Sequence, residues 1–362
     1  MKDLTGVLDI APYSLDRAEK RAFLSNELRE CTRFHYEQCM EYRRMMDAIG
    51  LNLHALPEYD ELPFLPVRLF KEFELKSVTE DEIVKTMTSS MTTGQNASKI
   101  FLDRATSTFQ TKALTKIVSE YLGKKRVPML ILDSSSVLNN RNMFSARGAG
   151  ILGFSMFGSK REYAFNKKME LAVSSVKNFL ETHRGERIFM FGFTFMIWQH
   201  FYKILIANDY RPDLSNAILI HGGGWKKLIS ESVSKEQFKK CLNDVCGIKT
   251  SNIHDYYGMV EQTGTIYIEC EKGHMHTSVF SDVLIRRQED FSLAGVGEHG
   301  IIEVVSILPQ SYPGHVLLTE DEGMILGEDD CPCARKGKYF KIFGRVKNAE
   351  IRGCSDTYAT KF

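Results

Sequence analysis

The sequence predicts an α/β fold in which doubly wound α/β layers are followed by a β-rich segment. Residues 127–133 form a short apolar run that ends in Asp133, which is typical of a buried parallel strand. Strand-like runs alternate with helical patterns up to about residue 258, and from about residue 265 the chain changes to closely spaced strands and turns. The alternation indicates a doubly wound layer, and the later change indicates an added sheet or small barrel.

The individual elements follow from apolar spacing and from turn residues. Residues 15–48 have apolar positions three and four apart, so we expect a long amphipathic helix or helix pair capped by Ser14. Thr79 and Glu82 have the spacing of a capping box around one helical turn. Further along we expect strands at 99–102, 127–133, 187–193 and 216–224, helices at 106–122, 166–183, 194–207 and 234–246, and substrate-facing loops over 134–165.

The chain is expected to form one body with parts of different character. We predict an α/β body over residues 1–264 with two subdomains, and a β-rich subdomain of the same body over residues 265–345. A short tail follows over residues 346–362. No internal repeat or polar linker separates these parts.

The composition excludes several classes of function. A net charge of +1 gives no electrostatic basis for binding nucleic acid. No apolar run reaches the roughly 18 residues of a membrane span, and the acidic residues near the N-terminus argue against a secretory signal. The eight scattered cysteines are therefore expected to be reduced thiols, metal ligands or a nucleophile. We expect a cytoplasmic protein, and the sequence leaves its oligomeric state open.

Three stretches have the composition of ligand-binding loops. Residues 88–99 read TSSMTTGQNASK, where hydroxyl side chains, a glycine and Lys99 suit a cradle for phosphate or, equally, a surface turn. Residues 221–225 read HGGGW, whose glycines allow close approach to a flat ligand or a tight turn. Residues 256–264 read YYGMVEQTG, with an aromatic that can stack on a base and Glu261, which can hold Mg²⁺. Each motif is weak alone, and their order in the chain strengthens them.

In that order the three stretches resemble the phosphate and adenine segments of adenylate-forming ligases. LLTEDEG at 317–323 and FGR at 343–345 resemble the ribose-binding segments of the same enzymes. More narrowly, the chain is similar to the acyl-protein synthetases of bacterial luminescence from about residue 30 onward, in the stretches LPFLPVRLFK, SKIFLD, SARGAGILGFS, FGFTFMIWQ, IHGGGWK and RGCSDT.

This resemblance implies the large domain of an adenylate-forming ligase, with the usual C-terminal lid domain largely absent. The implied cofactors are ATP and Mg²⁺. A carboxylate would attack the α-phosphate of ATP, and a thiol would then take the acyl group. The implied nucleotide contacts are Ser89, Ser90, Thr92, Thr93, Gly94 and Lys99 for phosphates, Gly222, Gly223, Gly224, Tyr257 and Gly258 for adenine, Asp321 and Arg345 for ribose, and Glu261 for Mg²⁺.

The resemblance also implies an acyl-carrying cysteine near the C-terminus, which would be Cys354, although an inert thiol is the more frequent fate of a cysteine. The acid would be a carboxylic acid of unspecified length, and an acyl reductase is the implied partner. Two alternatives stay open: a carboxylate–CoA ligase of the phenylacetate type, and an inactive subunit of the same fold.

A structural zinc site is a further possibility. Cys270, His276, Cys331 and Cys333 can supply the four ligands of tetrahedral zinc, with His274 as an alternative to His276. Phenylacetate–CoA ligases are similar in this stretch. The alternative is a set of reduced cysteines that pack in the core.

Two features depart from the family pattern. Met91 stands where the phosphate loop usually has glycine, and a methionine would crowd a phosphate. The chain ends 17 residues after Arg345, so the usual lid lysine has no counterpart, and Lys347 and Lys361 are candidates by proximity alone. Arg147 is expected either to meet a substrate carboxylate or to form a structural ion pair.

Overall fold

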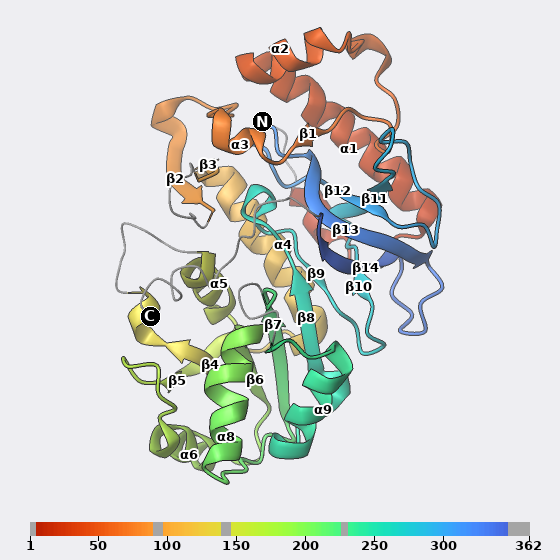
Figure 1. The fold of residues 1–362 in the computed structure, drawn as a ribbon. Helices are drawn as coiled ribbons and strands as arrows, with labels where there is room; N and C mark the ends of the chain where they lie inside the picture. The colour runs from red at the N-terminus through yellow and green to blue at the C-terminus, as the bar shows by residue number, and fades with distance from the viewer. Residues whose placement is uncertain (1–4, 90–96, 139–145, 226–230, 347–362) are drawn as a thin grey trace. The chain divides into compact units, whose positions relative to one another are not determined.

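A computed structural model describes residues 5–89, 97–138, 146–225 and 231–346 (Figure 1). Within these residues the chain forms two compact units. The first unit contains residues up to 121, 258–267 and those from 274 onward, and the second contains 122–257 and 268–273. The predicted division at residue 264 follows the change in sequence pattern and stays a prediction.

The second unit is built on a sheet with the strand order β5-β4-β6-β7-β8-β9. The neighbours from β5 to β8 all pair in parallel, which is the arrangement predicted from the alternation of strands and helices. Its strands are β4 (Val127–Ser134), β5 (Gly158–Phe165), β6 (Ile188–Phe193), β7 (Ala217–Gly222), β8 (Ile253–Tyr257) and β9 (Tyr267–Ile268), and its helices are α5 (Ala146–Ser155), α6 (Val173–Thr182), α7 (Thr194–Met196), α8 (Lys203–Ala207) and α9 (Lys235–Cys246).

The prediction of loops over residues 134–165 was wrong, because this stretch contains helix α5 and strand β5. Glycines in this stretch are compatible with a loop, but in the structure Gly150 and Gly158 allow close packing. A Cβ placed on Gly150 would lie 3.2 Å from the Phe193 ring and 3.7 Å from the Phe191 ring. The absent side chain therefore lets α5 approach the phenylalanines of β6.

Helix α6 also begins later than the predicted residue 166. The Asn166 side chain accepts hydrogen bonds from the backbone N–H groups of Lys168 (2.8 Å) and Glu170 (3.1 Å). This local turn competes with helix formation, which explains the start at Val173. The predicted helix over residues 194–207 is confirmed as a continuous helical stretch, in which residues 197–202 have π-helical geometry between α7 and α8.

The first unit is built on a mostly antiparallel sheet with the order β10-β14-β13-β12-β11, to which β1 adds in parallel along β13. A separate ribbon joins β2 to β3. The elements are β1 (Leu65–Pro66), β2 (Ile83–Thr88), β3 (Lys99–Asp103), β10 (Met275–His276), β11 (Ser281–Arg286), β12 (Gly300–Ser306), β13 (Val316–Glu328) and β14 (Lys338–Arg345), with α1 (Arg17–Gln38), α2 (Met40–Ala48), α3 (Leu69–Glu72) and α4 (Arg104–Leu122).

The N-terminal helix pair was predicted, but its cap was not. Asp16 caps α1 instead of Ser14, and it forms a capping box with Glu19. Ser14 donates a hydrogen bond to the Ala11 carbonyl instead. The capping box of Thr79 and Glu82 is confirmed. In the part of the chain that the structure describes, no helix combines the length and apolar character needed to cross a membrane.

Candidate functional site

A glycine turn follows β7 at the carboxyl edge of the parallel sheet, where α/β sheets bind ligands. Gly222 is buried and lies opposite Tyr256 of the neighbouring strand β8. A Cβ on Gly222 would lie 2.4 Å from Cε1 of Tyr256, so only glycine fits there. Gly223 has a positive φ of 77°, and both Gly223 and Gly224 are exposed. The turn therefore presents bare backbone beside an aromatic ring.

The aromatic packed against this turn is Tyr256, which sequence reasoning passed over. Its ring centroid lies 5.2 Å from that of Phe154 and 6.2 Å from that of Phe191. Successive side chains of a strand point to opposite faces, so Tyr257 points away from this cluster. Tyr257 is half-buried and the following Gly258 is exposed. Tyr256 is thus a packing residue, and adenine stacking on Tyr257 stays a prediction.

Glu261 lies in the first unit, on a single helical turn over Val260–Gln262. The turn is anchored by Gln262, whose amide donates to the carbonyls of Val304 (3.2 Å) and Gly314 (2.9 Å). Burial raises the pKa of the Glu261 carboxyl, and the neighbouring Ser98 and Arg345 partly offset this rise. Ser98 and Arg345 offset only part of the cost of burying a charged carboxylate. A cation bound beside Glu261 would stabilise its charged form further.

Asp321 and Arg345 are brought together by the pairing of β13 with β14, in which they stand directly opposite each other. The Arg345 guanidinium lies 3.7 Å from an Asp321 carboxylate oxygen and 3.3 Å from one of Glu320. Each of the three side chains is partly exposed. A carboxylate and a guanidinium at one strand position can bind the hydroxyls of a sugar.

The phosphate loop is described only at its ends. Ser89 follows β2, and its hydroxyl accepts a hydrogen bond from the Ser98 backbone N–H (3.0 Å) just before β3. Lys99 forms an exposed ion pair with Glu74, with 2.7 Å between nitrogen and oxygen. The other predicted loop residues, Ser90, Thr92, Thr93 and Gly94, and also Met91, lie outside the described residues.

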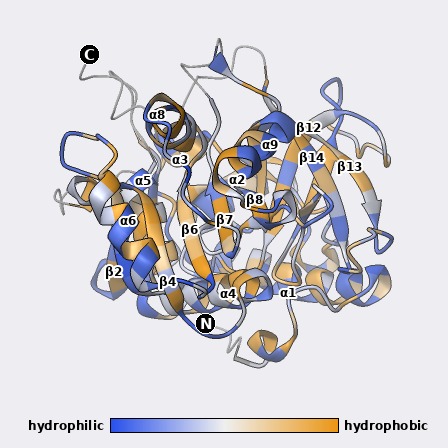
Figure 2. Ribbon diagram, turned by 90° about the horizontal axis from the view of Figure 1, so that it is seen from below, coloured by the Kyte–Doolittle hydropathy of each residue, from blue (hydrophilic) through white to orange (hydrophobic). Residues whose placement is uncertain are grey.

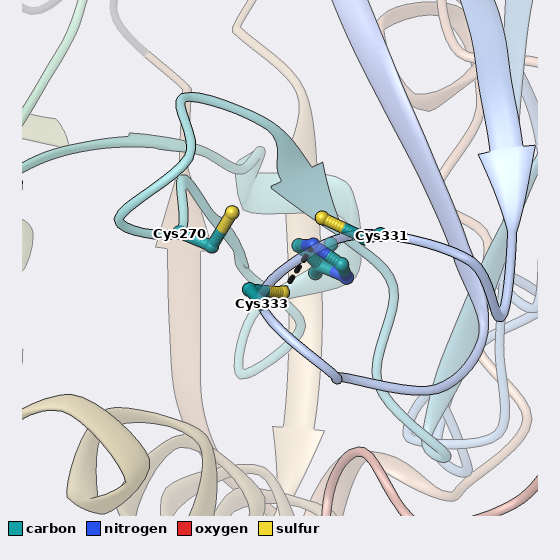
Figure 3. A group of neighbouring side chains, drawn as sticks. Cys270, Cys331 and Cys333 are labelled. Atoms are coloured by element: carbon teal, nitrogen blue, oxygen red, sulfur yellow. Dashed lines mark hydrogen bonds between the residues drawn. The ribbon is translucent and has the colours of Figure 1, made fainter.

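Three cysteines and one histidine form a compact cluster. Cys270 lies on the connection between β9 and β10, His276 on β10, and Cys331 and Cys333 on the turn between β13 and β14. Their ligand atoms all lie within 4.8 Å of one another, and Figure 3 shows the three cysteine sulfurs converging. Cysteine sulfur and histidine nitrogen are the ligands of tetrahedral structural zinc, so the donor set fits zinc.

The second predicted histidine contacts the same cluster. His274 Nδ1 lies 3.3 Å from Cys331 Sγ, while His276 Nε2 lies 3.3 Å from Cys333 Sγ. Although burial opposes it, hydrogen bonds involving Arg335 lower the pKa of the Cys333 thiol, which favours the thiolate that metals bind. His276 completes the four-residue group, and His274 lies beside it.

The sequence matches the family described as Acyl-protein synthetase, LuxE over residues 2–362. The chain belongs to this family. Two long-chain-fatty-acid–luciferin-component ligases are similar: that of Aliivibrio fischeri is 24% identical over 95% of this chain and 90% of its own, and that of Vibrio harveyi is 21% identical over 97% and 91%. The resemblance predicted from the motifs is thereby confirmed.

Solved structures show the fold independently. An open conformation of 2-hydroxyisobutyryl-CoA ligase, in complex with 2-HIB-AMP and CoA, has a TM-score of 0.71 and 16% identity, covering 94% of this chain and 78% of that one. A postadenylation state of the same ligase also scores 0.71, at 16% identity and 94% and 70% coverage. The acyl-protein synthetase chain thus has the adenylate-forming ligase fold that was predicted. Its membership of the family makes it a ligase.

The remaining predicted residues of this acyl-protein synthetase are Arg147, Cys354 and the two candidate lysines. Arg147 forms a buried ion pair with Asp133 at the end of β4, so the structural alternative predicted for it holds. The Nε–H group of Arg147 donates a hydrogen bond to Oδ2 of Asp133, with 2.6 Å between the two atoms. Cys354 lies outside the described residues, as do Lys347 and Lys361, so their roles stay predictions.

Proposed function

We propose that this acyl-protein synthetase activates a long-chain fatty acid as its adenylate and passes the acyl group to the thiol of Cys354. The observation that carries this proposal is the family match over residues 2–362, within which the nucleotide motifs occur in order. The names of the two similar ligases support a long-chain fatty acid for this chain, and the description of the family supports a protein acceptor. An acyl reductase is the acceptor class that best suits a thioester product.

In the first step a carboxylate oxygen attacks the α-phosphorus of ATP, and pyrophosphate leaves with the electron pair of the broken P–O bond. Catalysis of such a step consists mainly of positioning and neutralisation of charge. The glycine turn and Tyr257 would hold adenine, and Asp321 with Arg345 would hold the ribose. The phosphate loop, with Lys99, would hold the triphosphate.

Mg²⁺ is the cation that this chemistry requires, and Glu261 fits it. The carboxylate is buried, and Glu320 is a second acidic group nearby. The positive charge of Arg345 offsets the effect of burial on Glu261 only in part. Glu261 would therefore hold Mg²⁺, which when bound neutralises charge on the phosphates.

In the second step the thiolate sulfur of Cys354 attacks the carbonyl carbon of the acyl adenylate, and AMP leaves with its oxygen. The product is a thioester, which keeps the acyl group reactive toward a partner. Arg352, two residues before Cys354, would favour the thiolate by its charge.

The first test is ATP–pyrophosphate exchange with a panel of carboxylic acids of increasing chain length. We expect exchange that depends on long-chain acids, and Glu261→Gln should reduce it about a hundredfold through lost charge neutralisation. As a control, Glu298→Gln alters an exposed glutamate on a turn of the first unit and should leave exchange unchanged. Folded protein without exchange for any acid would refute adenylation.

The second test follows the acyl group. Radioactive acid with ATP should label the protein covalently, and Cys354→Ser should keep exchange but lose the label. Cys241→Ser, at a half-buried cysteine on α9, should keep both. Label that survives Cys354→Ser would rule out this nucleophile, and acyl transfer to CoA without any labelled enzyme would favour the carboxylate–CoA ligase alternative.

We also propose that the cysteine–histidine cluster holds structural zinc, which would fasten the turn between β13 and β14 and take no part in the chemistry. Purified protein should contain about one zinc per chain, and Cys331→Ser should lower both zinc content and thermal stability. Cys241→Ser is again the control. Folded, metal-free protein with unchanged stability would contradict this site.

A further inference from the structure

A buried hydroxyl lies directly under the glycine turn. Thr194, at the start of α7, donates its hydroxyl proton to the Gly222 carbonyl, with 3.2 Å between the oxygens. The same oxygen lies 2.9 Å from Nδ1 of His221. Thr194 and His221 are 7% and 4% exposed, so water does not compete for these bonds. The end of β6 is thus fastened to the end of β7 through a single side chain.

The hydrogen-bond geometry fixes the state of the histidine ring. A threonine hydroxyl has one proton, and the Gly222 carbonyl can only accept, so His221 must donate from Nδ1 to Thr194. Asp255 is the other nearby acceptor, but its oxygen lies 3.9 Å from Nδ1, which is too far for a hydrogen bond. Lys235 is paired with Asp255 at 2.9 Å and compensates its charge.

The ring stays neutral and is held from its other side as well. Burial lowers the pKa of His221 to about 3; the charge of Glu269 opposes this shift, whereas Lys239, Lys235 and His254 add to it. The Phe238 ring of α9 packs on the imidazole, with 4.8 Å between centroids. His221 is therefore a rigid neutral donor at physiological pH, and it cannot act as an acid or base toward a ligand.

We propose that Thr194 and His221 are positioning residues for nucleotide binding, which hold the turn Gly222–Gly224 in the shape that receives adenine. The inference rests on the proposed function of this turn. Gly223 has a positive φ, and a Cβ on Gly224 would meet no atom of the described residues within 4 Å. The two glycines therefore do not fix their own backbone conformation. The bond from Thr194 to the Gly222 carbonyl supplies that restraint.

The molecule contains a matched control with the same chemistry elsewhere. Thr32 on α1 is buried, donates to the Leu28 carbonyl at 2.8 Å, and lies 3.0 Å from Nε2 of the buried His315. This threonine belongs to the first unit, and its partners Leu28 and His315 are not candidate nucleotide residues. Thr32→Val removes an equivalent hydroxyl without altering the glycine turn.

The binding assay can use intrinsic fluorescence, because the two tryptophans of the protein are close to the turn. Trp225 follows Gly224 directly, and the Trp198 ring lies 5.7 Å from that of Trp225. We expect AMP to bind Thr194→Val roughly tenfold more weakly than wild type, because a carbonyl and an imidazole N–H lose their partner. The KM for ATP should rise by a similar factor while kcat changes little.

Thr194→Ser keeps the hydroxyl and should bind AMP as tightly as the wild type. Thr32→Val should lower thermal stability about as much as Thr194→Val does, but it should not weaken the binding of AMP. If Thr194→Val does not fold, the AMP affinities of His221→Asn and His221→Leu are compared instead. Asparagine can mimic the Nδ1 donor and should keep the affinity, whereas leucine should lose it. Wild-type AMP affinity in Thr194→Val, or equal weakening by Thr32→Val, would overturn the inference. Wild-type protein that binds neither AMP nor ATP would instead refute the nucleotide site itself.

Discussion

The two six-stranded sheets place their charged residues differently. Strands β6 and β7 are buried along their whole length, and their one ionisable side chain is His221, which is neutral. The antiparallel sheet buries Asp282 and Arg286 within β11 and Glu303 within β12. Figure 2 shows the same contrast, with β4 and β6 in the colour of apolar residues and β13 alternating between polar and apolar.

This difference shows how each unit holds its candidate site residues. In the parallel sheet, shape and neutral hydrogen bonds position the glycine turn, through Tyr256 and Thr194. In the antiparallel sheet, opposite charges position Asp321 and Arg345. Substitutions that alter charge should therefore act mainly through the antiparallel sheet, and substitutions that alter volume should act mainly at the glycine turn. The buried pair of Arg147 with Asp133 at the end of β4 is an exception. The predictions below test that division.

The largest expected effect is the loss of the buried charge of Asp282. Its carboxylate lies 3.3 Å from the Lys20 nitrogen and 2.7 Å from that of Lys338, and it accepts from the Tyr59 hydroxyl at 2.6 Å. Asp282→Asn removes the carboxylate that pairs with the buried Lys20 and the half-buried Lys338, so the free energy of unfolding should fall by roughly 3–5 kcal/mol. Urea unfolding measures this change.

An exposed pair provides the control for Asp282. Asp244 pairs with Lys240 on α9, where both side chains are more than half exposed. Asp244→Asn should change the free energy of unfolding by less than about 1 kcal/mol. Similar effects for the two substitutions would show that burial does not set the strength of these pairs, and the contrast between the sheets would lose its basis.

These pairs also show where prediction from sequence stops. A run such as residues 127–133 is apolar because both of its faces are buried, so β4, β6 and β7 could be predicted, whereas β5 was not. Charged residues normally indicate exposure, so the burial of Asp282 could not be predicted without knowing its partners, which lie 262 and 56 positions away.

The site shows the same limit. The glycine turn, Glu261, Asp321 and Arg345 were found because they stand in short motifs with a fixed order. Tyr256 and Thr194 were not, because their roles depend on which strands lie side by side. Helix α5 was missed since its glycines are equally compatible with a loop, and the packing against Phe193 decides between the two.

The second prediction concerns two buried histidines of the first unit. His35 and His315 stack with 4.9 Å between ring centroids, and His35 also contacts the Ser77 hydroxyl (2.8 Å) and the Pro309 carbonyl (3.1 Å). Burial lowers the pKa of His35 to about 4, which the bond to Pro309 only partly opposes, and it lowers the pKa of His315 as well. Both rings are therefore neutral in the folded protein at neutral pH.

The sign of the pH effect follows from this. The unfolded histidine takes up a proton near pH 6.5, whereas the folded one does so only near 4, so stability is full above about pH 6.5 and falls as pH drops toward 4. The slope for one group reaches at most about 1.4 kcal/mol per pH unit. His35→Gln keeps a donor for the Pro309 carbonyl. It should reduce the slope of the free energy of unfolding against pH by the contribution of one proton, whereas the substitution His54→Gln, at an exposed histidine, should leave that slope unchanged. An unchanged slope in His35→Gln would contradict the assignment.

The third prediction alters volume in the second unit. In Gly222→Ala the new Cβ would meet the Tyr256 ring, which Phe154 and Phe191 hold in place, so the free energy of unfolding should fall by roughly 1–3 kcal/mol. The loss should not depend on salt, because no charge is involved. In Gly224→Ala the new Cβ would meet no atom of the described residues within 4 Å, so the substitution should not change the free energy of unfolding. Equal losses at the two glycines would show that close packing on Tyr256 is not the cause.

The smallest effect on stability is expected at Lys99. Its pair with Glu74 has side chains that are 52% and 55% exposed, and such a pair contributes about 0–1 kcal/mol and weakens with salt. Lys99→Met should therefore leave the free energy of unfolding nearly unchanged. If Lys99 leaves Glu74 to bind the triphosphate, the KM for ATP should rise several-fold while AMP affinity stays the same, because AMP lacks the β- and γ-phosphates. Glu74→Gln breaks the same pair but keeps the lysine, so its KM should not rise. A parallel loss of AMP and ATP affinity in Lys99→Met would mean that the lysine acts on the fold of the β2–β3 ribbon and not on the phosphates.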